Sequence, residues 1–235
     1  SRSQLDAQGK KFCAALFYGT LERRLTLDEI IKSYSAKPAD KLNPEVRNIL
    51  RTALYQILYM NSVPESAAVN EAVKLAAKNR NPAVKGYVNG LLRAFLREDK
   101  KLPQQKDPLE KLAFEYSCPL PLVKKWAQEY GRQTAEQMLA TSLGRPPVTA
   151  MVNTTLTTPE ALCEELRAEG FGAEVNAHFA DCVNIAGASL ESAEAFKKGL
   201  FHVQDISSRI CCGALGAQAG ETVLDLCAAP GGKSF

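Results

Sequence analysis

The chain has 235 residues, of which 46% are hydrophobic and 23% are charged, and its formal net charge is +3. Its length allows two modest domains or three small ones, with an ordinary composition for a folded protein. No apolar stretch reaches the roughly 18 residues that a membrane helix requires, and the N-terminus does not have the pattern of a signal or transit peptide. We therefore expect a cytoplasmic protein that makes no contact with a membrane.

The charge is unevenly distributed along the chain. Residues 1–100 carry 17 Lys and Arg against 10 Asp and Glu, whereas residues 101–235 carry 12 against 16. A basic first half suits a polyanion such as RNA, although a solvated helical surface explains the excess equally well. The seven cysteines are scattered without a C-x-x-C pair, and there are only two histidines. This predicts reduced thiols and no zinc site.

Residues 1–99 have a helical pattern throughout. Apolar residues recur three and four positions apart, as in the run from Val46 to Leu58, so we predict an all-α bundle of about five helices. Asn70, Glu71 and Asn89 lie among these apolar positions. We interpret them as buried hydrogen-bonding groups between helices rather than as RNA ligands.

The pattern changes twice after residue 99. A polar, proline-bearing linker (100–108) leads into two or three short helices that extend to residue 143. Strand-like segments then alternate with helical ones, and Thr158 is a candidate N-cap. From residue 201 we expect a strand at 201–203, a helix at 207–215, and a strand at 223–226.

The segment after the last expected strand carries the strongest chemical signal. The strand ends at Asp225, and a loop of small residues follows, from Cys227 to Ser234. Sheets of the α/β type present backbone amides to nucleotide-like ligands just past the carboxyl end of a strand. The loop therefore predicts a ligand site.

Two ligands compete for this loop. Its last residues end like a phosphate-binding P-loop, but Cys227 stands where that motif has its first glycine. Pro230 has no amide hydrogen to donate, and Asp225 would repel a polyphosphate. A sulfonium compound with an ammonium group tolerates an acidic neighbour, so we favour S-adenosylmethionine over ATP. A plain strand-to-helix turn is a third interpretation.

The nine residues Asp225-Leu226-Cys227-Ala228-Ala229-Pro230-Gly231-Gly232-Lys233 resemble the first cofactor-binding motif of the RNA cytosine-5 methyltransferases of the Sun/NOL/NOP2 family. Val203-Gln204-Asp205 and Ser207-Ser208 also resemble that family. Residues 17–21, 63–73 and 87–93 resemble a NusB-like domain. A NusB-like domain ahead of such a methyltransferase is the arrangement of bacterial enzymes of this family that act on 16S ribosomal RNA.

The resemblance implies a fold of class α followed by α/β. An all-α NusB-like bundle that lacks its first helix would occupy residues 1–99, and connecting helices residues 100–143. A small, RRM-like α+β module would occupy residues 144–200, and residues 201–235 would begin a Rossmann-type methyltransferase sheet with its first strand. The family's R-x-N at the start of the module is replaced by Met151-Val152-Asn153.

The resemblance also implies the chemistry. The cofactor would be S-adenosylmethionine and the partner 16S ribosomal RNA, bound by a monomer. The predicted cofactor-binding residues are Cys227, Ala228, Ala229, Pro230, Gly231, Gly232 and Lys233, and no metal is expected. In this family a Cys thiolate attacks C6 of cytosine, C5 takes the methyl group, and a base removes the C5 proton.

No catalytic residue is expected within this chain. The family's two functional cysteines belong to motifs that would follow Phe235, and we interpret Cys211 and Cys212 as core residues of a helix. We therefore predict that the 235 residues alone transfer no methyl group. A non-catalytic RNA-binding or regulatory module is the alternative, and a P-loop nucleotidase is a third possibility.

Overall fold

The structure is a computed structural model that describes residues 5–144, 148–187, 190–229 and 231–234. The chain divides into two compact units, Ser1–Gly144 and Arg145–Phe235. No helix in the described ranges is long and apolar enough to cross a membrane.

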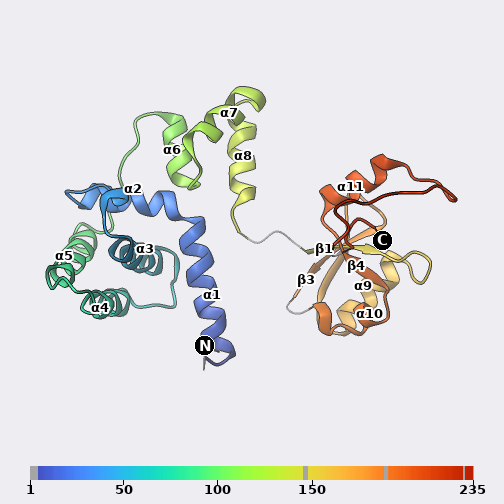
Figure 1. Ribbon diagram of the computed structural model, residues 1–235, viewed down its shortest axis with the longest axis horizontal. Coiled ribbons are helices and arrows are strands. Elements are labelled where there is room, and N and C mark those ends of the chain that lie inside the picture. Colours follow the sequence, from blue (N-terminus) through green and yellow to red (C-terminus); the bar gives the residue numbers. More distant parts are fainter. Residues whose placement is uncertain (1–4, 145–147, 188–189, 230, 235) are drawn as a thin grey trace. The chain divides into compact units, whose positions relative to one another are not determined.

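The first unit is entirely helical, and its first part confirms the predicted bundle of five helices (Figure 1). The 3-10 helix η1 (Ala39–Lys41) lies between the second and third of them. The five helices are α1 (Ala7–Glu22), α2 (Arg24–Tyr34), α3 (Pro44–Tyr59), α4 (Glu65–Ala76) and α5 (Ala83–Arg97).

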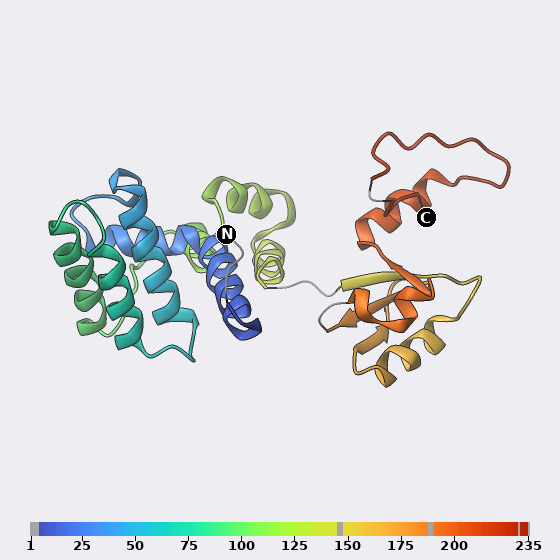
Figure 2. The ribbon, with the colours of Figure 1, turned by 60° about the horizontal axis from the view of Figure 1, so that its bottom comes forward.

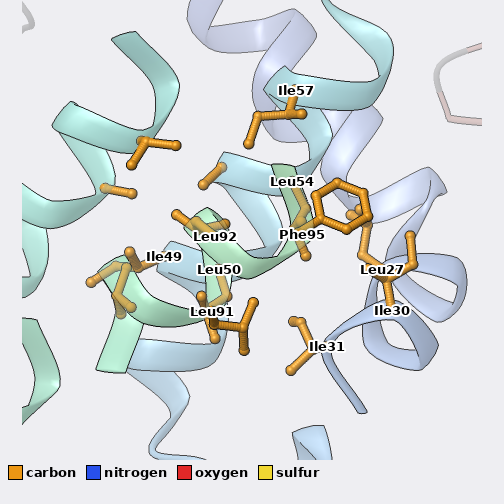
Figure 3. Close-up of a cluster of buried hydrophobic side chains, with 14 of the residues drawn as sticks. Leu27, Ile30, Ile31, Ile49, Leu50, Leu54, Ile57, Leu91, Leu92 and Phe95 are labelled. Atoms are coloured by element: carbon orange, nitrogen blue, oxygen red, sulfur yellow. The ribbon is translucent and has the colours of Figure 1, made fainter. Parts of the chain in front are cut away.

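Helix α3 is the centre of this bundle, since it packs against α1, α2, α4 and α5. Figure 3 shows the core between α2, α3 and α5, where large aliphatic side chains surround Phe95. Leu27, Leu54 and Leu92 are fully buried there. The apolar spacing of three and four in the sequence therefore corresponds to one buried face on each helix.

Helix α1 approaches α3 closely because Gly19 has no side chain. A Cβ atom at Gly19 would overlap the hydroxyl and ring of Tyr55 on α3. A larger residue at position 19 would therefore force the Tyr55 ring to move.

The connecting helices α6 (Pro108–Glu115), α7 (Leu120–Tyr130) and α8 (Arg132–Ser142) lie close to the predicted ranges. They share a small core of Leu112, Val123 and Leu139. The turn after α6 is also bonded to α2, because Ser117 Oγ accepts from Leu25 N at 3.1 Å and Thr26 Oγ1 donates to the Phe114 carbonyl at 2.6 Å. These helices are therefore part of the first unit.

The second unit contains the predicted small α+β module. Its four-stranded sheet has the order β2-β3-β1-β4, and every adjacent pair is antiparallel. Helices α9 and α10 lie against one face, where Leu162, Leu166 and Ala195 meet Ala150 and Val183 of the sheet. The elements are β1 (Val148–Val152), α9 (Pro159–Ala168), β2 (Gly172–Val175), β3 (Cys182–Ala186), the 3-10 helix η2 (Leu190–Ser192), α10 (Glu194–Lys197) and β4 (Phe201–Val203).

Strand β4 lies beyond residue 200, where we expected the next domain to begin. It pairs with β1, with Val152 opposite Phe201, and the Phe201 side chain is 3% exposed within the core of the module. The sheet therefore extends to Val203. A three-residue strand carries too little pattern to reveal which neighbour it pairs with.

The predicted strand at residues 223–226 is not formed, and the described residues contain no Rossmann-type strand. After α11 (Ile206–Leu215) the described residues up to Ser234 form no helix or strand. Leu224 and Leu226 are 80% and 86% exposed. A strand needs partner strands for its hydrogen bonds and its apolar faces, and the described chain offers none here.

Two further expectations were wrong. Asn70, Glu71 and Asn89 are exposed rather than buried between helices, and Glu71 forms a surface ion pair with Lys74. On α11, Cys211 is exposed and Cys212 only half-buried. This helix has no buried residue among those described, because nothing there covers its apolar side.

Candidate functional site

The loop that the sequence singled out folds back toward α11. Figure 2 shows the chain leaving the end of α11, running outward and returning. Gln204 Nε2 donates to the Gly232 carbonyl, and Cys212 Sγ donates to the Lys233 carbonyl at 3.4 Å. We call residues 225–234 the terminal turn.

One pocket collects most of the predicted cofactor-binding residues. Its volume is about 140 Å³. Gly231 lies in the turn but does not line the pocket, and Pro230 lies outside the described residues. The lining consists of Val203, Gln204, Asp205 and Ser208 together with Cys227, Ala228, Ala229, Gly232 and Lys233 of the turn.

Asp225 holds the terminal turn together. One carboxylate oxygen accepts from Cys227 N at 2.9 Å and the other from Ser234 Oγ at 2.8 Å. The bond from Ser234, followed by that from Cys227, lowers the pKa of Asp225 below its usual value. Both oxygens are therefore occupied by groups of the turn itself, and the carboxylate is charged at neutral pH.

The backbone amides of the turn are divided into two sets. Cys227 N donates to Asp225, and Gly231 N and Ser234 N donate to carbonyls of the turn. The amides of Ala228, Ala229 and Gly232 have no hydrogen bond within the described residues. A P-loop directs a longer run of amides at phosphate oxygens. This division, with an ionised carboxylate beside it, disfavours a polyphosphate.

The lining residues outside the turn add a buried amide, that of Gln204, and a carboxylate, that of Asp205. Burial of Gln204 is nearly complete, at 4% exposure, and its Oε1 has no partner in the described residues. The bond from the Ser207 side chain, followed by that from Ser207 N, lowers the pKa of Asp205, so this carboxylate is ionised opposite Lys233. A carboxylate, an ammonium and a buried acceptor suit a ligand that carries both an amine and an acid.

The pocket fits one part of a nucleoside-sized cofactor and not the whole. Ligand pockets that enclose such molecules have volumes of roughly 300 Å³ or more. The terminal turn with Gln204 and Asp205 thus provides one wall of a site. The described residues contain no group of three side chains that could hold a metal ion.

The structural role of Gln204 could not be derived from the loop motif alone. The signal was present in the Val203-Gln204-Asp205 segment, which stood apart from the loop by about twenty residues.

Asn153, in the altered R-x-N position, has a local role: its amide donates to the Gly199 carbonyl at 3.1 Å and its oxygen accepts from Thr155 Oγ1.

Two known families match successive parts of the chain. Residues 1–97 match the NusB family, and residues 118–190 match the ferredoxin-like domain of RsmF/B-like methyltransferases. The chain is RsmB-like. Its bundle of five helices corresponds to the NusB match. The ferredoxin-like match contains α7, α8, the strands β1, β2 and β3, and α9, and it ends before β4.

Curated relatives extend the RsmB-like match over nearly the whole chain. A probable ribosomal RNA small subunit methyltransferase B from Bacillus subtilis (strain 168) is 36% identical over 233 residues, covering 99% of this chain and 52% of the relative. The ribosomal RNA small subunit methyltransferase B of Serratia proteamaculans (strain 568) is 34% identical, covering 93% of this chain and 50% of the relative. The chain therefore spans about half the length of these relatives.

A solved structure has the same fold. The crystal structure of PH0851 matches with a TM-score of 0.71 and 24% sequence identity, and the alignment covers 99% of this RsmB-like chain and 52% of the other. At this identity the likeness concerns the fold alone.

Proposed function

We propose that this chain serves the S-adenosylmethionine-dependent methylation of cytosine C5 in 16S ribosomal RNA. One observation carries the proposal: relatives named as small-subunit ribosomal RNA methyltransferases match almost the whole chain, and five of the seven residues of its cofactor motif line one pocket. The free amides of Ala228, Ala229 and Gly232, with Gln204 and Asp205, would hold the cofactor from one side. The cofactor supplies the methyl group when bound.

The cytosine-activating thiolate is not assigned to any cysteine of this chain. Cys227 is exposed beside the cofactor turn, where a small side chain allows close approach of a ligand. In the proposed reaction a cysteine outside these 235 residues attacks C6, and a base outside them removes the C5 proton. The partner is 16S ribosomal RNA, the protein acts as a monomer, and the reaction takes place in the cytoplasm.

The test is methyl transfer by the natural protein that contains this sequence. With S-[methyl-³H]adenosylmethionine and deproteinised 16S ribosomal RNA we expect tritium in the RNA, and bisulfite sequencing should locate it at a cytosine. Substitution Gly232→Gln, which places a long side chain in the turn, should abolish transfer. Absence of tritium incorporation into RNA by the unaltered natural protein would refute the proposal.

The second candidate is a non-catalytic RNA-binding module. It is favoured by the small pocket and by the lack of a Rossmann-type sheet among the described residues. The two candidates differ in the reading frame after Phe235. Further Pro-Cys and Thr-Cys-Ser motifs there support the enzyme, whereas a stop codon supports the binding module.

The 235-residue chain provides a separate check on the cofactor site. Calorimetric titration with S-adenosylmethionine should show weak binding or none, because one wall of a site cannot exclude water from the ligand. Micromolar affinity would show that the described turn is a complete site.

A further inference from the structure

Helix α5 stands out from the other helices by its charge. It carries Lys85, Arg93 and Arg97 and no carboxylate. Every other described helix with two or more Lys or Arg residues also contains an Asp or Glu. The charge of α5 is therefore not balanced within the helix.

The cations of α5 form a row on the solvent side. Lys85, Asn89, Arg93 and Arg97 follow one another at intervals of four residues, so they lie along one line of the helix, which we call the α5 ridge. All four are exposed, while Val88, Leu92 and Phe95 are buried on the opposite side. The face that bears the ridge is thus free of contact with the bundle core.

The ridge has no internal charge partners. Eight other Lys and Arg side chains of the described residues form ion pairs, but those of Lys85, Arg93 and Arg97 form neither an ion pair nor a hydrogen bond. Like charges four residues apart, as at Arg93 and Arg97, destabilise a helix. Nothing in the described fold offsets that cost.

Two glycines lie beside the ridge. A Cβ atom added at Gly86 or Gly90 would meet nothing within 4 Å, so the packing of this unit does not require glycine at either position. Glycine within a helix is less stable than alanine. Their effect is to leave the backbone of α5 open next to the cations.

We propose that the α5 ridge binds the sugar-phosphate backbone of RNA, with Lys85, Arg93 and Arg97 facing phosphates and the Asn89 amide donating to the backbone. The two glycines let the strand approach the helix. The choice of RNA rests on the proposed function, and the surface itself rests on the geometry of α5. Protein interfaces are anchored by Trp and Tyr as well as Arg, and the ridge has no aromatic residue, whereas Arg, Lys and Asn are typical phosphate contacts.

The test measures RNA binding by the 235-residue chain. The probe is a fluorescein-labelled RNA hairpin, titrated by anisotropy over a series of salt concentrations. The triple variant Lys85→Ala, Arg93→Ala and Arg97→Ala should bind more than tenfold more weakly. It should also lower the slope of log affinity against log salt by about one per side chain removed.

A charge-matched variant of the same unit is the control. Lys111→Ala, Lys124→Ala and Arg132→Ala remove three exposed cations from α6, α7 and α8. Their effect should be limited to the general loss of positive charge. If the affinity of the ridge variant for the hairpin is within twofold of that of this control, the proposal that the α5 ridge binds RNA is refuted.

A second variant keeps the charge and changes the shape. Gly86→Gln and Gly90→Gln place long neutral side chains beside the ridge and should raise the melting temperature, because glutamine is the better helix former. RNA affinity should nevertheless fall several-fold, and an unchanged affinity would contradict the close approach.

The partner class is tested with polyglutamate. If polyglutamate binds the unaltered chain as tightly as the hairpin does, the ridge is a site for acidic protein and the RNA assignment is wrong. Methyl transfer is measured separately on the natural protein. The ridge variant could lose RNA binding while the natural protein transfers no methyl group to RNA. That result would support RNA binding by the α5 ridge and refute only the proposed function.

Discussion

The ferredoxin-like module and the segment that follows it have similar apolar content but opposite burial. Ala150 and Val183 in the sheet are fully buried, whereas Leu224 and Leu226 of the predicted last strand are almost fully exposed. Ile210 and Leu215 on α11 are exposed as well. The strand pattern is good in both regions, so pattern does not explain the difference.

What differs is the supply of partners. Each strand of the module lies beside one or two others, and α9 and α10 cover one face of the sheet. The segment around Leu224 has no neighbouring strand among the described residues. An apolar strand pattern thus shows that a segment can form a strand. Whether the strand forms depends on neighbouring strands that pair with it.

Truncation of one apolar side chain in each region should give the largest contrast. Phe201→Ala removes a ring that packs against Phe196 in the core and should cost about 3–5 kcal/mol of unfolding free energy. Leu226→Ala should change it by less than about 0.5 kcal/mol, because the side chain is exposed. Hydrogen exchange of the β1 amides, measured at increasing urea concentrations, gives the unfolding free energy of each variant. Equal losses of unfolding free energy in the two variants would contradict the comparison.

Thiol reactivity should separate the same two regions. Burial, reinforced by the charge of Asp181, raises the pKa of Cys182 to about 11, whereas Cys211 and Cys227 are exposed. At pH 8 the thiolate fraction of Cys182 should be on the order of a hundredfold below that of an ordinary thiol. Iodoacetamide labelling with peptide mapping should modify Cys211 and Cys227 first. In urea all three should react alike, and equal rates in the folded chain would refute the contrast.

The bond between the two regions at Gln204 should have an intermediate effect. Gln204→Ala removes the donor to the Gly232 carbonyl and should weaken the terminal turn by about 1 kcal/mol. Faster exchange of the Ser234 amide is the expected result. Gln218→Ala, at an exposed loop residue, is the matched control, and an unchanged exchange rate in Gln204→Ala would show that the turn is held without this bond.

The smallest expected effect is the pH dependence of the ion pair between Arg209 on α11 and Asp181, the residue before β3. Burial raises the pKa of Asp181, but the hydrogen bonds and charge of Arg209 outweigh it and lower the pKa below the usual 3.8. The stabilisation is therefore complete above the unfolded-state pKa and is lost as the pH falls through the lower folded-state pKa. Unfolding of the module between pH 5 and pH 2, monitored by circular dichroism, should show a shallower decline in Arg209→Ala than in the unaltered chain. If the stability of both chains falls equally with pH, the Asp181–Arg209 ion pair does not contribute to the pH dependence.

Much of the fold could be predicted because its signals are local. The five-helix bundle follows from apolar spacing, and Thr158 caps α9 by accepting from Ala161 N as expected. The errors involve relations between distant residues. Asn70, Glu71 and Asn89 lie near apolar residues along the chain, but the helix turns them to the solvent side.

The candidate site divides in the same way. Five of the seven residues that the loop motif predicted to bind the cofactor line one pocket, and their contact with a cofactor stays a prediction. The motif left open whether Asp225 would hold the loop or a ligand's ammonium, and in the structure it accepts from Cys227 N and Ser234 Oγ of the loop. It could not predict that Gln204 would reach the Gly232 carbonyl. These bonds depend on how the chain folds back after α11.

By itself the sequence determined the helices, the module and the family to which they are related, since periodicity, caps and short motifs are properties of neighbouring residues. Only the tertiary structure decided that β4 completes the sheet of the module. It also decided that, among the described residues, the last apolar segment pairs with no strand and one face of α5 carries cations without ion pairs beside open glycines. Burial and pairing are relations between segments, and they exist only when the chain has brought those segments together.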